Sequence, residues 1–368
     1  MGFKCGIVGL PNVGKSTLFN ALTATAAAEA ANYPFCTIEP NVGRVGVPDP
    51  RLYELAHIAK SATLLPTQLE FVDIAGLVKG ASRGEGLGNK FLSHIREVDA
   101  LIHVVRAFND SNITHVEGSI HPIRDIEIIE TELMLADLES LERRIQSLSK
   151  KAKAPGKEGE EAKALIALCE KLLPLLHEGK PARALSITSD EKLLFQSLNL
   201  ITSKPILFVA NVQESDARMG NEWVQEIQAY AQKNGARSVF ISAAIEAEIS
   251  QLDSEDRAGF LETLGLQETG LSRVIREGYG LLDLLTFFTI GPKEARAWTV
   301  RRSAKAPEAA GVIHTDFEKG FICAETISYT DYITTQGESN AKASGKMRLE
   351  GRDYLVQDGD VFHFRFNV

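Results

Sequence analysis

The chain has 368 residues, of which 44% are hydrophobic and 24% are charged, and its formal net charge is −9 at pH 7. This length predicts two or three domains, and the composition excludes an intrinsically disordered, collagen-like or disulfide-built protein. Because the overall charge is negative, any contact with a nucleic acid has to come from a local basic patch.

The cysteines and the apolar segments indicate a cytoplasmic protein. The 4 cysteines lie far apart without a C-x-x-C pair, which argues against a zinc site and gives no support to a disulfide framework. No apolar run approaches the roughly 18 residues that a membrane-spanning helix needs. We therefore expect free thiols, a cytoplasmic location and no contact with a membrane.

Strands and helices alternate along most of the chain. Residues 4–10 are predicted to form a buried strand and residues 15–27 a helix, and further apolar strands are predicted at 69–73, 101–105, 206–210 and 238–241. This alternation predicts an α/β fold with a parallel sheet.

A phosphate-binding loop is predicted between the first strand and the first helix. Residues 9–16, Gly-Leu-Pro-Asn-Val-Gly-Lys-Ser, fit the pattern G-x-x-x-x-G-K-[ST] in the chain context that this loop requires. The backbone N–H groups of such a loop hold the α- and β-phosphates of a nucleotide. We expect Lys15 to reach the β- and γ-phosphates and Ser16 to ligate Mg²⁺.

Two further segments are typical of a nucleotide-dependent switch. Asp73 and Gly76 form the pattern D-x-x-G after a strand, which predicts that Asp73 holds Mg²⁺ through water and that the Gly76 N–H senses the γ-phosphate. The glycine-rich residues 80–88 are then a switch segment, or alternatively only a flexible loop. Thr37 is the candidate for closing on Mg²⁺, and Leu77 replaces the usual water-orienting glutamine, which predicts slow hydrolysis.

A histidine is the candidate replacement for that glutamine. His103 lies inside a predicted strand and is interpreted as a core residue, and His94 is interpreted as part of a helix face. His115 lies in a polar stretch from which a loop would bring it to the γ-phosphate. An ordinary surface histidine is the alternative interpretation of His115.

A helical insertion is predicted between the strands at 101–105 and 206–210. Leucine-rich seams with heptad spacing occur at Met134, Leu138, Leu141, Ile145 and Leu148, and again at Leu165, Leu168, Leu172 and Leu175. A polar break at residues 150–159 would be the tip of an antiparallel hairpin. Two ordinary amphipathic helices on the sheet are the alternative.

The residues predicted to contact the nucleobase favour adenine. A guanine site uses N-K-x-D after a strand, but residues 211–214 read Asn-Val-Gln-Glu. Adenine offers a donor at N6 and an acceptor at N1, which Asn211 and the backbone around Val212 can pair with better than the carboxylate of Glu214. Ser242 and Ala243 are expected to add backbone contacts. A tolerant guanine site with Glu in place of Asp is the alternative.

The residues from about 282 to 368 predict a small, mostly β C-terminal domain. An Asp-Gly turn lies between strands expected at 354–356 and 361–366.

Together these segments resemble the YchF family of Obg-like ATPases. The resemblance runs nearly end to end, through GLPNVGKST at 9–17, NYPFCTIEPN at 32–41, FVDIAGLVKGASRGEGLGNKF at 71–91, NVQE at 211–214, SAAIEAEI at 242–249 and HTDFEKGF at 314–321. It implies a P-loop G domain over residues 1–130 and 200–280, an inserted helical coiled-coil hairpin over 131–199, and a β-grasp TGS domain over 281–368.

The resemblance also implies an ATPase that binds GTP as well, because the family carries N-[VLM]-x-E at the base site. Carried over by position, it implies that the phosphates contact Asn12, Val13, Gly14, Lys15, Ser16 and Thr17. It implies Mg²⁺ ligation by Ser16 and Thr37, adenine contact through the main chain of Val212, and His115 as the catalytic substitute for glutamine. Asn12 resembles the asparagine that coordinates K⁺ in related switch proteins, which implies stimulation by K⁺.

The family is associated with ribosomes and stress responses, so we expect a monomer that contacts the ribosome at its large subunit. One candidate basic patch at the hairpin comprises Arg143, Arg144, Lys150, Lys151, Lys153 and Lys157, and a second comprises Lys293, Arg296, Arg301, Arg302 and Lys305. A solvated helix end is the alternative for the first patch. The leading functional hypothesis is a slow ATPase switch, and its rival is a nucleotide-gated binding module with incidental hydrolysis.

Overall fold

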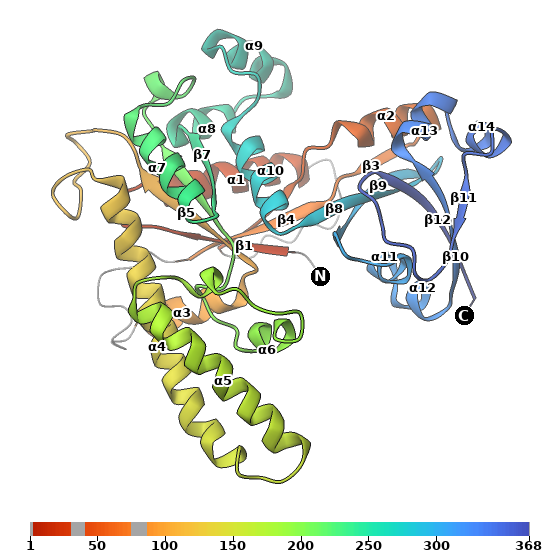
Figure 1. Ribbon diagram of the computed structural model, residues 1–368. Helices are drawn as coiled ribbons and strands as arrows, with labels where there is room; N and C mark the ends of the chain where they lie inside the picture. Colours follow the sequence, from red (N-terminus) through yellow and green to blue (C-terminus); the bar gives the residue numbers. More distant parts are fainter. Residues whose placement is uncertain (1–2, 31–40, 75–86, 368) are drawn as a thin grey trace. The chain divides into compact units, whose positions relative to one another are not determined.

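The computed structural model describes residues 3–30, 41–74 and 87–367 (Figure 1). The chain divides into two compact units. The larger unit takes in Phe3–Gly43 and Glu70–Val274, and the smaller unit takes in Arg44–Leu69 and Ile275–Val368. Across the described ranges, every helix is too short or too polar to span a membrane.

The larger unit is built on a six-stranded sheet of strand order β2-β4-β1-β5-β6-β7. Its strands are β1 (Phe3–Val8), β2 (Val42–Gly46), β4 (Gln68–Asp73), β5 (Ala100–Arg106), β6 (Ile206–Asn211) and β7 (Arg237–Ile241). The pairs β1 with β5, β5 with β6 and β6 with β7 are parallel, which confirms the predicted sheet. Every residue of β5 and β6 is buried, as expected for central strands covered on both faces.

Helices cover this sheet, and Figure 1 shows α1 and α3 on opposite faces of it. The helices of this part of the chain are α1 (Lys15–Ala30), α3 (Leu87–Glu97), α7 (Glu222–Lys233), α8 (Ala243–Ile249), α9 (Ser254–Leu264) and α10 (Gly270–Leu281). The parallel strands place the loops after β1, β5, β6 and β7 at one edge of the sheet. That edge is where α/β proteins bind ligands.

The predicted helical hairpin is confirmed. Helices α4 (Pro122–Lys151) and α5 (Lys157–His177) lie side by side, and the short α6 (Lys192–Ser197) follows them (Figure 1). Met134, Leu141, Leu168 and Leu172 are buried between them as the heptad spacing predicts. The buried residue that follows Leu172 is Leu176 instead of the predicted Leu175. The spacing is four residues in this turn of α5, which contains Pro174.

The smaller unit contains a second six-stranded sheet, of order β11-β10-β12-β8-β9-β3. Its strands are β3 (Thr63–Leu65), β8 (Leu284–Ile290), β9 (Glu294–Arg301), β10 (Phe321–Ser328), β11 (Arg348–Glu350) and β12 (Asp360–Phe366). Its helices are α2 (Pro50–Ala59), α11 (Ala306–Ile313), α12 (Thr315–Lys319), α13 (Tyr329–Thr335) and α14 (Glu338–Ala343). The sequence predicts a mostly β domain here, and the structure adds these helices to the expected strands.

The segment 44–69 departs from the predicted domain boundaries, which assign it to the first domain. Strand β3 pairs in parallel with β9, and Leu52 and Leu55 of α2 are buried in a core that contains Phe288 of β8. Apolar side chains at helical spacing need a partner surface, and here the sheet of the smaller unit supplies it. The rest of the predicted domain division stays a prediction.

The prediction of a strand at residues 354–356 is wrong. Only Leu355 forms a bridge there, to Lys305, and the main chain of Tyr354 and Val356 bonds instead to Ala306 and Ala304. Strand β12 pairs with β10 and β8. The Asp-Gly turn is present, but the strand that it precedes pairs with elements far away in the sequence, which a local pattern does not specify.

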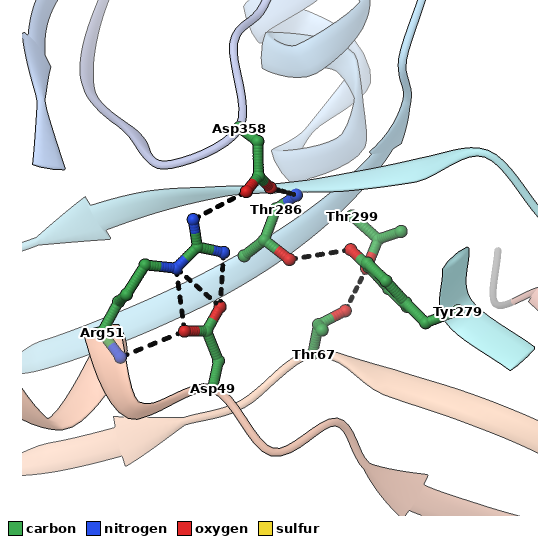
Figure 2. Close-up of polar contacts among 7 residues, drawn as sticks. All are labelled: Asp49, Arg51, Thr67, Tyr279, Thr286, Thr299 and Asp358. Carbon is green, nitrogen blue, oxygen red and sulfur yellow. Dashed lines mark hydrogen bonds and ion pairs between the residues drawn. The ribbon is translucent and has the colours of Figure 1, made fainter. Parts of the chain in front are cut away.

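Ion pairs of Arg51 with Asp49 and Asp358 connect the start of α2 to the rest of the smaller unit (Figure 2). Asp49 caps the helix by accepting from the N–H of Arg51 at 3.0 Å, and it also binds the Arg51 guanidinium. The same guanidinium donates to Asp358 at 2.7 Å, and Asp358 in turn accepts from the N–H of Thr286 in β8 at 2.9 Å. These bonds raise the pKa of Arg51 above its ordinary value.

A hydroxyl network makes a second link from the same segment (Figure 2). The hydroxyls of Thr67 and Thr299 are hydrogen-bonded, and Tyr279 bonds to Thr286 at 2.8 Å and to Thr299 at 3.3 Å. Burial raises the pKa of Tyr279 to about 12, so it is protonated at neutral pH and able to donate. Both ends of the segment 44–69 are therefore tied by side chains to the C-terminal residues.

Replacing Asp358 by alanine is expected to lower the free energy of unfolding of the smaller unit by about 1–2 kcal/mol, because Arg51 and the Thr286 N–H both lose an acceptor. Asp353→Ala is the matched control, since Asp353 also pairs with a cation, Lys305, but its side chain is 94% exposed. Urea denaturation of both variants tests this expectation. Equal midpoints for the two variants would show that the Asp358 contacts do not stabilise this unit.

Candidate functional site

The phosphate loop lies between β1 and α1, where the sequence predicts it. Gly9 has φ +152° and Gly14 has φ +100°, a region that side chains other than glycine rarely adopt. A Cβ on Gly9 would lie 2.4 Å from the carbonyl oxygen of Val104, and a Cβ on Gly14 would lie 2.3 Å from Nδ2 of Asn211. Both glycines are thus required by the close approach of β5 and β6.

Lys15 and Asp73 form the charged part of this loop. Lys15 is 8% exposed and its Nζ donates to the carbonyl of Leu10 at 2.7 Å. Burial lowers the pKa of Lys15, and the charge of Asp73 opposes this effect. Burial raises the pKa of Asp73, opposed by Lys15. An anion with several oxygens placed here would satisfy a buried ammonium better than one neutral carbonyl does.

The donor set fits Mg²⁺. Ser16 is exposed in the first turn of α1, and Asp73 ends β4, the neighbour of β1 in the sheet. Hydroxyl and carboxylate oxygens are the protein ligands that Mg²⁺ takes alongside phosphate oxygens and water. The described residues contain no group of three or more His, Cys, Asp or Glu side chains that would hold a metal alone. Thr37, Gly76 and Leu77 lie outside the described residues.

A cavity of about 700 Å³ adjoins the phosphate loop. It is lined by Asn12, Gly14, Thr17, Phe108, Asp110, Ile113, Asn211, Val212, Gln213, Glu214, Ser215, Ser242, Ala243 and Ala244. The structure therefore brings the predicted phosphate and base residues to one site. The sequence interpretation missed Phe108, Asp110 and Ile113, although their place directly after β5 puts them at the ligand-binding edge of the sheet.

The side chain of Asn211 links two loops of the site, and its predicted contact with a base stays a prediction. It is 6% exposed, its Nδ2 donates to the carbonyl of Val13 at 3.0 Å, and its Oδ1 accepts from the N–H of Ala243 at 2.9 Å. The predicted backbone contact from Ala243 is affected too, because this N–H is already bonded. Asn211 thereby holds the phosphate loop against the loop after β7.

Ser242 and Val212 lie at the base end of the cavity. Ser242 is 3% exposed, and its Oγ has no hydrogen-bond partner among the described residues. Val212 donates its N–H to the carbonyl of Ile241 at 2.8 Å, so a main-chain contact from Val212 to a ligand has to use its carbonyl. Glu214 is exposed at the start of a short 3-10 turn. A ligand with polar edges at this end would satisfy the Ser242 hydroxyl.

The histidines differ sharply in their surroundings. His103 is buried in β5, and burial with the nearby charges of Lys15 and Arg183 lowers its pKa to about 3, which fits its interpretation as a core residue. His94 is exposed on α3, as predicted. His115 has a side chain only 5% exposed, bonded through Nε2 to Asp125 at 2.9 Å and through Nδ1 to the N–H of Glu117 at 3.1 Å. Its catalytic role stays a prediction.

Replacing Gly14 by alanine is expected to weaken nucleotide binding by about 100-fold, because the new Cβ collides with Asn211 and the backbone stays in a strained region. The matched control is Gly179→Ala, since Gly179 has φ +74° but no atom within 4 Å of its Cβ position. Titration calorimetry with ADP and GDP measures both variants. Equal affinities in the two variants would contradict the role given to the contact between Gly14 and Asn211.

Comparison with known proteins identifies the family of the chain. Residues 4–155 match a family described as 50S ribosome-binding GTPase, and residues 284–367 match the YchF GTPase C-terminal family, described as a protein of unknown function. The Haemophilus influenzae protein named ribosome-binding ATPase YchF is 59% identical over 368 residues, with all of both chains covered. The Bacillus subtilis protein of that name is 55% identical over 370 residues, again with both chains fully covered.

A solved structure agrees as well. The Schizosaccharomyces pombe YchF GTPase aligns with a TM-score of 0.89 and 39% identity, and the alignment covers 99% of this chain and 98% of that one. Identity at this level over the full length of both chains shows the family. The chain belongs to the YchF family of P-loop nucleotide hydrolases.

Proposed function

We propose that this chain is a slow, Mg²⁺-dependent ATPase that acts as a nucleotide-controlled switch in the cytoplasm and also binds GTP. The observation that carries this proposal is the base end of the cavity, where Val212 replaces the lysine that would lie along a guanine and Glu214 replaces the aspartate. The relatives named ribosome-binding ATPase support it.

Adenine matches the groups at the base end better than guanine does. The carbonyl of Val212 is able to accept from the adenine N6 amine, and the buried Ser242 hydroxyl is able to donate to a ring nitrogen. A carboxylate recognises guanine by accepting from two donors, whereas adenine offers only one donor on that edge. Glu214 on its longer side chain therefore adds little for either base.

The chain's own residues account for slow hydrolysis. The N–H groups of the phosphate loop and the Lys15 ammonium would hold the phosphates, and Ser16, Asp73 and Thr37 would hold Mg²⁺. The bound Mg²⁺ supplies positive charge to the β- and γ-phosphate oxygens. Leu77 offers no group to orient water, which leaves His115 as the proposed substitute. The same sequence resemblance makes K⁺ at Asn12 part of this proposal.

A nucleotide-gated binding module is the second candidate function. The observation that favours it is the ring of His115, whose nitrogens are both occupied by Asp125 and Glu117. A histidine held in this way needs a rearrangement before it orients a water molecule. If that rearrangement requires a partner, hydrolysis becomes part of the signal only when the partner is bound.

The proposed partner is the ribosome, at its large subunit, contacted by a monomer. Lys150, Lys151 and Lys153 are exposed at the hairpin tip, whereas Arg143 and Lys157 pair with neighbouring glutamates. In the second patch, Arg302 pairs with Asp283, Lys305 pairs with Asp353, and Arg296 stacks on Trp298. The hairpin tip is thus the stronger candidate for contact with RNA phosphates.

Calorimetry with ATP and GTP, each with Mg²⁺, tests the base preference. The wild type is expected to prefer ATP, and the double variant Val212→Lys with Glu214→Asp is expected to shift toward GTP, because it restores the groups that pair with guanine. A wild type that prefers GTP would mean that residues 211–214 form a tolerant guanine site, and the ATPase proposal would then fail.

Replacing Lys15 by alanine is expected to abolish ATP hydrolysis, because the loop loses the charge that neutralises the γ-phosphate. Single-turnover assays with and without ribosomes measure the rate for the wild type and the variant. Turnover retained in the variant would contradict the proposed site. A wild-type rate that ribosomes leave unchanged would favour the binding module with incidental hydrolysis.

A further inference from the structure

One arginine of the larger unit has an unusual environment. Arg106, the last residue of β5, is 2% exposed and donates through all of its nitrogen atoms to main-chain carbonyls. Nε donates to Phe108 at 3.2 Å, Nη2 to Asp110 at 3.2 Å and Nη1 to Ile113 at 3.0 Å. The guanidinium also lies 4.4 Å from the ring centroid of Phe108. The Arg106 side chain therefore binds three carbonyls of the loop that follows β5.

This loop, residues 107–114, is here called the wall loop, and other side chains bind three more of its carbonyls. Ala107 accepts from Asn221 at 2.8 Å, Asn109 from Gln213 at 2.6 Å, and Thr114 from Asn12 at 3.1 Å. Two of these donors, Asn12 and Gln213, come from the phosphate loop and the base motif. The wall loop is thus bonded at one end to the phosphate site and near its middle to the base site.

The wall loop faces the cavity. Phe108, Asp110 and Ile113 line it together with Val212, Gln213 and Glu214. The carbonyls of the same three wall-loop residues are the ones that Arg106 holds. Because a flexible loop has to be ordered at the expense of binding energy, a loop ordered in advance strengthens binding of the group that packs on it.

We propose that Arg106 is a positioning residue for nucleobase recognition, which holds Phe108 and Ile113 as a fixed apolar wall at the base end of the cavity. The inference rests on the proposed function and adds a residue to that site which does not itself touch the nucleotide. The wall loop leads directly into His115, whose ring is held by Asp125 and by the N–H of Glu117.

The chemistry of the side chain supports this role over simple packing. A buried cation is costly, and an apolar residue of similar volume would fill a core position more cheaply. The planar guanidinium of arginine directs its donors toward three separate carbonyls at once. The ammonium of lysine, at the end of a flexible chain, does not match this arrangement. The arginine is therefore explained by the loop that it organises.

The test is Arg106→Lys in the full chain, with ADP and GDP as probes in calorimetry at saturating Mg²⁺. We expect ADP affinity to fall about tenfold, because two or more hydrogen bonds that order the wall are lost. The ratio of ADP to GDP affinity is expected to fall as well, since a mobile wall discriminates bases less. Arg183→Lys is the matched control, a partly buried arginine of the same unit that pairs with Glu130 and lies outside the cavity.

A variant at the edge of the loop covers the case in which Arg106→Lys does not fold. Asn221→Ser keeps the cap of α7, because serine caps helices well, but it loses the amide that donates to the carbonyl of Ala107 and to the carboxylate of Asp216. ADP affinity is then expected to fall about threefold without loss of folding.

Unchanged ADP affinity and unchanged base preference in folded Arg106→Lys, or in Asn221→Ser if the first variant is unfolded, would overturn the inference. Equal losses in Arg183→Lys would do the same, because they would show a general effect of destabilisation. Failure of the proposed function looks different, since the wild type itself would then prefer GDP. The affinity loss in Arg106→Lys would still report on the wall in that case.

Discussion

The side-chain amide of Asn211 makes two hydrogen bonds that hold together the loops of the candidate nucleotide site. Its donor side binds the phosphate loop at Val13, and its acceptor side binds the loop after β7 at Ala243. Since the amide is buried, water does not substitute for either partner, and a lost bond leaves a polar group unsatisfied. The glycine at position 14 follows from the same contact, because the amide nitrogen occupies the space of a side chain.

The phosphate half of the site was predictable because its residues are contiguous. The loop, its lysine and its serine occupy eight successive positions, and Asp73 follows a strand that reads as buried. The base half was only partly predictable. A motif gives the residue type at position 211 but not the direction of its side chain, and Phe108 and Ile113 reach the site only through the strand order β1-β5-β6.

Elements of the fold were likewise predictable where their packing partners lie nearby in the sequence, and less so where the partners are far away. Heptad spacing predicts α4 and α5 because their partners are each other, a few residues apart across the tip. The partner of α2 is a sheet more than 200 residues later in the chain, since Leu52 and Leu55 pack near Phe288. Residues 354–356 illustrate the same limit, because a strand pattern does not say whether a neighbouring strand is within reach.

The membership of residues 44–69 in the smaller unit makes that unit discontinuous in the amino-acid sequence. A fragment that starts at residue 284 lacks β3, the edge strand beside β9, and leaves the apolar surface under α2 open to water. Cutting the chain before β8 also strips the cover from Leu52 and Leu55 in what remains. Each piece on its own therefore exposes apolar side chains that the intact chain buries, so we expect both pieces to be less soluble than the whole protein.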